Sequence, residues 1–308
     1  MQNTVNKSFS LSGVTLHGGL ISNVSVHPAT ANTGIVFRRT DLKVPHEEAL
    51  VEASYDNVMS TELCTKLSNS FGNSISTIEH IMSAFHGMGI DNAIVEVDCN
   101  ELPILDGSSI EYVLSIEKVG IKSLNIKKNI LTVVRPIIFN LGDSYIKVTP
   151  SNNFIIDYTI VYDHDLINKQ KFIYQFKDQK QYKRLISNCR TFGFKHEVAN
   201  LRDKGLIAGG SLDNAILLDK TGIVNNEKLR HKDEFVKHKI LDFIGDIYLL
   251  GMSIKGNFEI YKGGHNLTQQ LMHSLMSDKS NYKIVQHQDS NVQKYSNNFH
   301  PKPIAVSL

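Results

Sequence analysis

The clearest periodic pattern in the sequence lies in FVKHKILDFIGD, residues 235–246. At about 100° per residue, one side of a helix here would be apolar, and its polar sector, roughly 100° wide, would hold His238, Lys239, Asp242 and Asp246. An ordinary amphipathic helix explains the apolar side. It does not explain a polar side with one histidine and two short carboxylates in place of the usual mixture of Lys and Glu. The pattern predicts a helix over about 233–250.

In the first half of the chain, short apolar runs bounded by turn residues predict strands at 14–16, 21–26, 34–39 and 92–97. Ser76-Thr77-Ile78-Glu79 has the form of a capping box, in which side chains satisfy the free N–H groups of a helix start. We therefore expect a helix through about His86, ended by Gly87 and Gly89. A second helix is expected at about 109–118, after a turn at 103–107.

The polar stretch KVGIKSLNIKKN, residues 118–129, is the candidate boundary between two domains, 1–123 and 124–308. Beyond it, the pattern predicts strands at 130–139, 145–148, 154–161, 215–218 and 258–261, and helices at 178–189, 233–250 and 266–276. The last twenty or so residues are polar and expected to be peripheral. Asp-Asn-Ala-Ile occurs at 91–94 and again at 213–216, which hints weakly at duplication. Strands and helices that mix without strict alternation predict an α+β fold.

Composition narrows the class of protein. The chain has 308 residues, 41% hydrophobic and 21% charged, with a formal charge of +2, which favours a globular protein over a general nucleic-acid binder. No apolar run approaches the roughly 20 residues of a membrane span, and the N-terminus lacks the order of a secretion signal. The three cysteines are widely spaced, which fits a reducing cytoplasm. No obligate interface is evident, so a monomer is expected.

His238 and Asp242 lie one helical turn apart, so both side chains can reach one metal ion, although a surface ion pair has the same spacing. A catalytic zinc takes three protein ligands and keeps one position open for water. The best third ligand is His80, because it follows Glu79, a carboxylate that could take a proton from the water. Alternatively, Glu79 only completes the helix cap.

His265 in KGGHNLT stands where a helix should begin. A helix N-terminus disfavours a protonated imidazole, so a catalytic His265 needs a carboxylate, and Asp246 is the obvious partner. On local sequence alone, a capping histidine is favoured. Thr191 and Phe192, in RTFGF, offer a hydroxyl beside aromatic rings, although by themselves they indicate a packed turn. Lys239 is expected to be solvated unless the ligand is an anion.

Four stretches closely resemble the UDP-3-O-acyl-N-acetylglucosamine deacetylases, the zinc amidases that commit Gram-negative bacteria to lipid A synthesis. They are SISTIEHIMSAFHGMGIDNAIVEVDCNELPILDGSS, FGFKHEVANLRDKGLIAGGSLDNAILLD, DEFVKHKILDFIGDIYLLG and YKGGHNLT. The segments TLHGG and ANTGIVFRRTDL near the N-terminus match as well. The similarity runs from about residue 4 to about residue 287, in the same order and without large gaps.

The resemblance implies two related α+β domains, each with helices layered against a β-sheet and with the active site between them. It implies a substrate, UDP-3-O-(3-hydroxyacyl)-N-acetylglucosamine, that loses acetate, and a hydrophobic passage in the second domain for its acyl chain. The implied ligands of Zn²⁺ are His80, His238 and Asp242, with Glu79 as general base. The other implied roles are oxyanion stabilisation by Thr191, acid or electrophile chemistry by His265 oriented by Asp246, and substrate contacts by Lys239 and Phe192.

One segment departs from the family pattern. Relatives commonly have an aromatic residue shortly before His-Pro in the 160s region, whereas here the segment is YDHD, residues 162–165, without proline. Tyr162 can still stack on uracil. The departure motivates an alternative, a zinc amidase of the same fold that acts on another nucleotide sugar. A third hypothesis is a non-catalytic nucleotide-sugar binding protein with a structural zinc, which would normally have four protein ligands.

Overall fold

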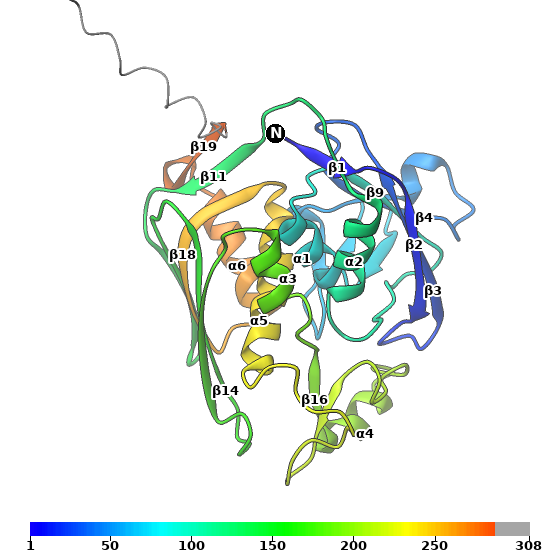
Figure 1. Cartoon of the computed structure of the whole chain (residues 1–308), viewed down its shortest axis with the longest axis vertical. Helices are drawn as coiled ribbons and strands as arrows, with labels where there is room; N and C mark the ends of the chain where they lie inside the picture. Colours follow the sequence, from blue (N-terminus) through cyan, green and yellow to red (C-terminus); the bar gives the residue numbers. More distant parts are fainter. Residues whose placement is uncertain (287–308) are drawn as a thin grey trace, which may run out of the picture.

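The computed structural model of the chain describes residues 1–286, and it consists of two helix-and-sheet halves that lie side by side (Figure 1). The first half contains a five-stranded sheet in the order β2-β3-β9-β4-β5 and a three-stranded sheet β6-β7-β8. The strands of the larger sheet are β2 (Phe9–Val14), β3 (Ile21–Pro28), β9 (Ala93–Val97), β4 (Ile35–Arg39) and β5 (Leu50–Glu52). Those of the smaller sheet are β6 (Val58–Ser60), β7 (Lys66–Ser68) and β8 (Ser74–Ser76). Helices α1 (Glu79–Met88) and α2 (Ile110–Val119) complete this half.

The second half is built on a seven-stranded sheet. Its central strand β18 (Ser253–Tyr261) runs parallel to β11 (Asn129–Val133) and β14 (Phe154–Val161) and antiparallel to β13 (Ser144–Thr149). The outer strands are β12 (Ile137–Leu141), β15 (Lys169–Gln175) and β19 (Tyr282–Gln286). Its helices are α3 (Gln179–Leu185), α5 (Glu234–Ile247) and α6 (His265–Met276).

Smaller elements connect and extend these halves. The pair β1 (Asn3–Val5) and β10 (Ile121–Ser123) joins the two ends of the first half. A small unit, which we call the β16–β17 unit, spans 192–218 and consists of β16 (Phe192–Phe194), α4 (Lys195–Asp203) and β17 (Ile216–Leu218). Within residues 1–286, 3-10 turns occur at η1 (His46–Ala49), η2 (Tyr55–Asn57), η3 (Tyr248–Leu250) and η4 (Lys279–Asn281).

Helices α1 and α5 pack against each other more extensively than any other pair of helices, and they lie in the interior between the two sheets (Figure 1). Gly245 makes the contact possible, because a Cβ atom there would lie 2.0 Å from the carbonyl oxygen of Glu79. All of α1 is buried, and so are His238, Asp242 and Asp246 on α5. The polar side of α5 is therefore enclosed, which rules out a surface ion pair between His238 and Asp242.

The predicted α+β class is confirmed, as are most of the predicted elements. The helices expected at 109–118, 233–250 and 266–276 are present, and so are the strands at 21–26, 34–39, 92–97, 145–148, 154–161 and 215–218, each within a few residues. The strand expected at 258–261 is present but begins earlier, at Ser253. The division into domains at residue 123 stays a prediction. The expected peripheral tail lies outside the described residues.

The capping box was a wrong prediction. Ser76 ends strand β8, and α1 begins only at Glu79, after Ile78, without a side-chain cap. The carboxylate of Glu79 is therefore not used to satisfy the helix start. Gly89, with φ of 71°, ends the helix as expected, whereas Gly87 lies within it.

Three other boundaries differ from prediction. The strand expected at 14–16 ends at Val14, because Thr15 opens a turn in which its N–H donates to the Leu20 carbonyl. The strand expected at 130–139 is two strands, β11 and β12, on either side of Pro136, which has no N–H to donate to a ladder. The helix expected at 178–189 already ends at Leu185. The sequence analysis did not predict the short strands β1, β5, β6, β7, β8, β10 and β16, most of β2, or the elements β15, α4 and β19.

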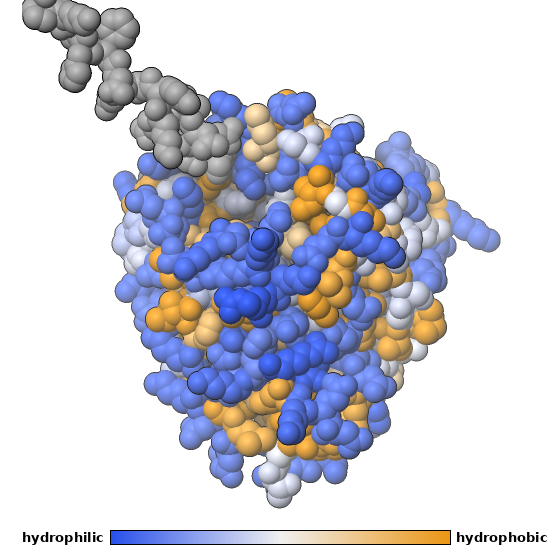
Figure 2. All heavy atoms as spheres, in the orientation of Figure 1, coloured by the Kyte–Doolittle hydropathy of each residue, from blue (hydrophilic) through white to orange (hydrophobic). Residues whose placement is uncertain are grey.

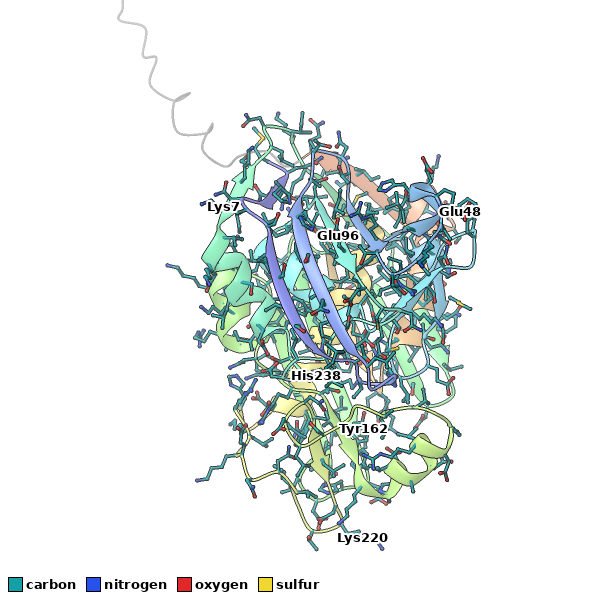
Figure 3. The ribbon with its side chains drawn as sticks, turned by 90° about the vertical axis from the view of Figure 1, so that its right-hand side faces the viewer. Lys7, Glu48, Glu96, Tyr162, Lys220 and His238 are labelled. Carbon is teal, nitrogen blue, oxygen red and sulfur yellow. The ribbon has the colours of Figure 1, made fainter. Side chains whose placement is uncertain are left out.

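Among residues 1–286, no helix combines the length and apolar character that crossing a bilayer requires. Figure 3 shows where His238 and Tyr162 lie, at the level where the two sheets meet the β16–β17 unit.

Candidate active site

Three side chains from the two halves converge on one point. His80 is the second residue of α1, and His238 and Asp242 are one turn apart on α5. The Oδ1 atom of Asp242 lies 3.2 Å from Nε2 of His238 and 3.6 Å from Nε2 of His80. One ligand atom from each of the three residues lies within 4.8 Å of the others. The structure thus brings together the three predicted metal ligands.

The hydrogen bonds around this group fit a divalent cation. His238 Nδ1 donates to the carbonyl of Cys189 at 3.0 Å, which leaves Nε2 with a lone pair facing the group. Burial lowers the pKa of His238 to about 3, so the ring stays neutral, the form that binds metal. Asp242 Oδ1 is buried and has no hydrogen-bond partner among the described residues. A buried carboxylate oxygen without a donor is costly, and a cation at this point would satisfy it.

The donor set is compatible with a catalytic metal ion such as zinc. Two imidazoles and one carboxylate are ligands that zinc prefers, and three protein ligands leave a fourth position for water. Within residues 1–286, the group contains no fourth His, Cys, Asp or Glu. Burial by itself would raise the pKa of Asp242, but attraction to the charged Lys239, 3.0 Å away, holds that pKa well below its usual value. Asp242 is therefore an anion at neutral pH.

Glu79 is the first residue of α1 and lies beside the group of His80, His238 and Asp242, which we call the metal group. Its Oε2 accepts a hydrogen bond from the backbone N–H of Thr65 at 3.2 Å, and its Oε1 is 4.0 Å from Nε2 of His265. Burial raises the pKa of Glu79, and the nearby His265 and His80 offset this only in part. A buried carboxylate with a raised pKa next to a metal is suited to accept a proton.

His265 forms a buried triad with Asp246 and Thr65. Its Nδ1 is 2.7 Å from Oδ2 of Asp246, and Thr65 Oγ1 donates to Oδ1 of Asp246 at 2.6 Å. Burial opposes protonation, but the Asp246 carboxylate outweighs it and raises the pKa of His265 to about 9. Helix α6 starts at His265 without a side-chain cap, so the alternative of a capping histidine was wrong.

Thr65 is a residue that sequence reasoning missed. It lies between β6 and β7 and is 2% exposed, and its hydroxyl is also 3.2 Å from Nδ1 of His265. Its backbone contacts Glu79 while its side chain contacts Asp246 and His265, so one residue links the predicted base to the predicted acid. A single threonine in a polar loop carries no signal that could have identified it.

The remaining predicted residues lie next to this group. Nζ of Lys239 is 3.0 Å from Oδ2 of Asp242 and 5.7 Å from the ring centroid of Phe192, so this lysine, with a side chain 22% exposed, is paired with Asp242 and only partly solvated. The ring of Tyr162 packs edge-on against Phe192 at 5.5 Å. Thr191 donates its N–H to the carbonyl of Gly107 at 2.8 Å, and with the metal group it lines a small cavity of about 30 Å³.

Comparison with known proteins identifies the family of this chain. Residues 2–277 match the family model of UDP-3-O-acyl N-acetylglycosamine deacetylase. The chain belongs to this family.

Named relatives in the family cover nearly the whole chain. A UDP-3-O-acyl-N-acetylglucosamine deacetylase of Syntrophus aciditrophicus is 42% identical over 281 residues, 91% of this chain and 88% of the relative. Proteins of the same name from Vibrio parahaemolyticus and Campylobacter fetus are 42% and 39% identical, covering 90% and 97% of this chain and 90% and 99% of those proteins. By name these deacetylases are hydrolases that cleave an amide.

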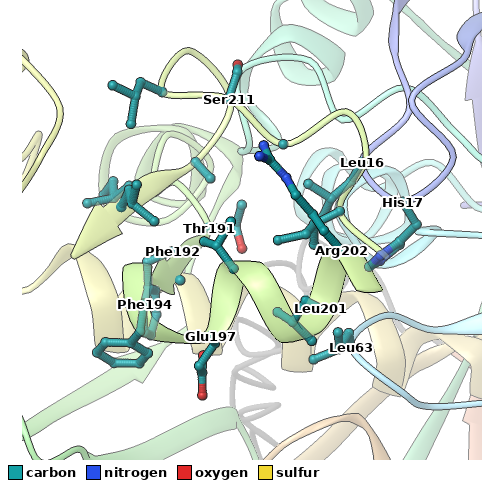
Figure 4. Close-up of a pocket in the computed structure, with 18 residues that line it drawn as sticks. Leu16, His17, Leu63, Thr191, Phe192, Phe194, Glu197, Leu201, Arg202 and Ser211 are labelled. Atoms are coloured by element: carbon teal, nitrogen blue, oxygen red, sulfur yellow. The ribbon is translucent and has the colours of Figure 1, made fainter. Parts of the chain in front are cut away.

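In this member of the deacetylase family, a second cavity adjoins the small one. It has a volume of about 370 Å³, and its walls come mostly from the β16–β17 unit (Figure 4). Leu16, Leu63 and Thr191 line both cavities. Phe192, Leu201 and Ile216 contribute to its apolar walls. An apolar cavity that meets a polar, metal-compatible group at Thr191 can hold the hydrocarbon part of a molecule whose polar part reaches the ligands.

Proposed function

We propose that this protein hydrolyses the acetamide of UDP-3-O-(3-hydroxyacyl)-N-acetylglucosamine, releasing acetate and the free 2-amine in the committed step of lipid A synthesis. The observation that carries this proposal is the buried group of His80, His238 and Asp242 beside Glu79, in which one carboxylate oxygen lacks a partner. Membership of the family and the names of the relatives support the substrate.

The proposed cofactor is Zn²⁺, held by His80, His238 and Asp242. When bound there, it would polarise the amide carbonyl and lower the pKa of a coordinated water. Glu79 then accepts the proton of the attacking water, since its buried carboxylate faces the same cavity.

His265 and Thr191 face the charge that develops on the substrate oxygen. His265 is protonated at neutral pH because Asp246 raises its pKa, so it supplies a positive charge and a proton to this cavity. The hydroxyl of Thr191 adds a neutral donor on another wall. After the C–N bond breaks, the leaving amine takes a proton from the pair Glu79 and His265, which together hold the protons needed for this step.

The substrate contacts follow from the two cavities. The acyl chain would occupy the 370 Å³ cavity, because its walls are mostly apolar and the cavity meets the reacting group at Thr191. Phe192 would line the binding site where the two parts of the substrate meet. Lys239, already charged and beside Phe192, would meet a substrate phosphate, and Tyr162 would stack on the uracil.

Two alternative functions make different predictions. A zinc amidase for another nucleotide sugar is favoured by the altered 162–165 segment, in which His164 bonds the carbonyl of Asp219 at 2.6 Å. A binding protein with a structural zinc is disfavoured, because a structural site normally has four protein ligands.

The decisive experiment measures acetate release from UDP-3-O-(3-hydroxyacyl)-N-acetylglucosamine by the zinc-loaded protein and by Glu79→Gln. We expect turnover by the wild type, a loss of about 10²-fold or more in the variant, and the same zinc content in both, as for removal of a general base. Wild-type protein that binds this compound and leaves it intact would contradict the proposal. Turnover of a different UDP-sugar in its place would select the first alternative.

A further inference from the structure

A third cavity shares no lining residue with the two at the candidate active site, and its volume is about 730 Å³. Its walls come from the C-terminal end of α1, the starts of β11, β14 and β18, and the segment that leads into α3. Figure 2, in the orientation of Figure 1, shows this face of the molecule hollowed above α3. The volume is within the range of about 300–1,000 Å³ that is usual for small-molecule sites.

Positive charge is concentrated around this cavity. Its lining contains four lysines, which are Lys128, Lys177, Lys180 and Lys255. The lining contains one acid, Asp178, and its Oδ1 already accepts a hydrogen bond from the N–H of Gln181 at 2.7 Å. The whole chain is nearly balanced, with 33 basic and 31 acidic residues, so four lysines against one acid is a local excess.

Few acidic side chains of the protein neutralise the charge of these lysines. Lys128 is 3.8 Å from Oδ1 of Asp91, a long ion pair. Lys177, Lys180 and Lys255 form no ion pair with any residue between 1 and 286. Like charges around one cavity repel each other, and an anion in the cavity would relieve the repulsion.

A buried histidine also lines the cavity. His86 is 7% exposed, and its ring packs edge-on against Phe154, Phe176 and Tyr248 at centroid distances of 5.2, 5.3 and 5.1 Å. Its Nδ1 is buried and has no hydrogen-bond partner among the described residues. A buried polar side chain without a partner in a native fold indicates a polar group that the protein does not supply. Burial, together with Lys128, lowers the pKa of His86 to about 3, so the neutral ring offers one N–H donor rather than a charge.

We propose that this cavity binds a small molecule that carries phosphate. The lysines supply the charge that phosphate oxygens require, and Lys binds phosphate as a point charge without a fixed geometry. Phe154 and Phe176 line the same cavity and offer apolar surface to a ring or chain attached to the phosphate. This inference does not depend on the proposed deacetylase activity, because none of these residues belongs to the candidate active site.

The test is calorimetric titration of the full-length protein with inorganic pyrophosphate at low salt. The double variant Lys177→Gln/Lys255→Gln removes two lining charges, and Lys122→Gln/Lys220→Gln removes two exposed lysines that do not line the cavity. We expect binding to weaken about tenfold in the first variant, because each of its two lost phosphate contacts should cost about threefold in affinity. Binding should weaken less than twofold in the second variant. Equal affinities in the wild type and the cavity variant, or equal losses in both variants, would overturn the proposal.

Two further measurements address the ligand and the folding of the variants. Phenyl phosphate should bind at least about fivefold more tightly than inorganic phosphate, because its ring gains contact with the aromatic wall. Equal affinities would show that the wall contributes nothing, and the class of ligand proposed here would be wrong. Acetate release and the thermal midpoint should be unchanged in the cavity variant, since its lysines lie outside the candidate active site and form no ion pair.

Discussion

The replacement Asp246→Asn should lower the pKa of His265 by several pH units. In the structure, Asp246 Oδ2 is 2.7 Å from Nδ1 of His265, and this carboxylate overcomes burial to raise the pKa from 6.5 to about 9. Asparagine keeps the shape and an oxygen acceptor but removes the charge. Burial and the positive end of helix α6 would then act on His265 with less opposition, and we expect a pKa below about 6.5.

The magnitude follows from the size of the change. A rise from 6.5 to about 9 corresponds to about 3 kcal/mol at 1.36 kcal/mol per pH unit. Because the pKa of the folded state lies above that of the unfolded state, this stabilisation is fully present below pH 6.5 and is lost as the pH rises toward 9. The wild type should therefore lose about 3 kcal/mol of this contribution between pH 6 and pH 9.5, and Asp246→Asn should not.

The assay is an NMR titration of the His265 imidazole in metal-free protein, so that no cation competes with the proton. Urea unfolding at pH 6 and pH 9.5 measures the same coupling through stability. A His265 pKa above about 8 in Asp246→Asn would refute the reasoning, because a group other than Asp246 would then be stabilising the protonated imidazole. A wild-type stability that does not change between the two pH values would refute the energetic argument.

Three other changes test neighbouring parts of the structure. Thr65→Val should lower kcat for acetate release about tenfold, as expected for the loss of one hydrogen bond to a charged group. Thr65→Ser keeps the hydroxyl and should stay within about threefold of the wild type. Equal rates in both variants would show that the hydroxyl has no role in turnover. Gly245→Ala should lower the free energy of unfolding in urea by about 1–3 kcal/mol or more, because its Cβ would lie 2.0 Å from the carbonyl oxygen of Glu79. The control Gly222→Ala, whose Cβ would have its nearest neighbour 4.0 Å away, should change this free energy little. His80→Ala should reduce the metal content from about one zinc per chain to less than about a tenth of that in elemental analysis, and a full zinc content would remove His80 from the ligand set.

The pattern of α5 shows how far local sequence reaches. Apolar spacing predicts the helix, and the same spacing places His238 and Asp242 on one face. Those inferences succeed because they depend on the geometry of a single element. The error at Ser76 has the same origin, because a capping box is a local rule and strand pairing of β8 with β7 overrode it. Resemblance to the family, which rests on the whole chain, supplied the expected substrate and the expected roles of Thr191 and His265, which local rules could not.

By itself, the sequence determined the α+β class, most of the helices, about half of the strands, and which residue types lie on which face of α5. Only the tertiary structure decided that His80 meets His238 and Asp242, that the polar side of α5 is enclosed, and that Thr65 joins Glu79 to His265. The physical reason is distance along the chain. Periodicity and capping act over a few residues, whereas these contacts join residues more than 150 positions apart in most cases, and they form only when α1, α5 and α6 pack together.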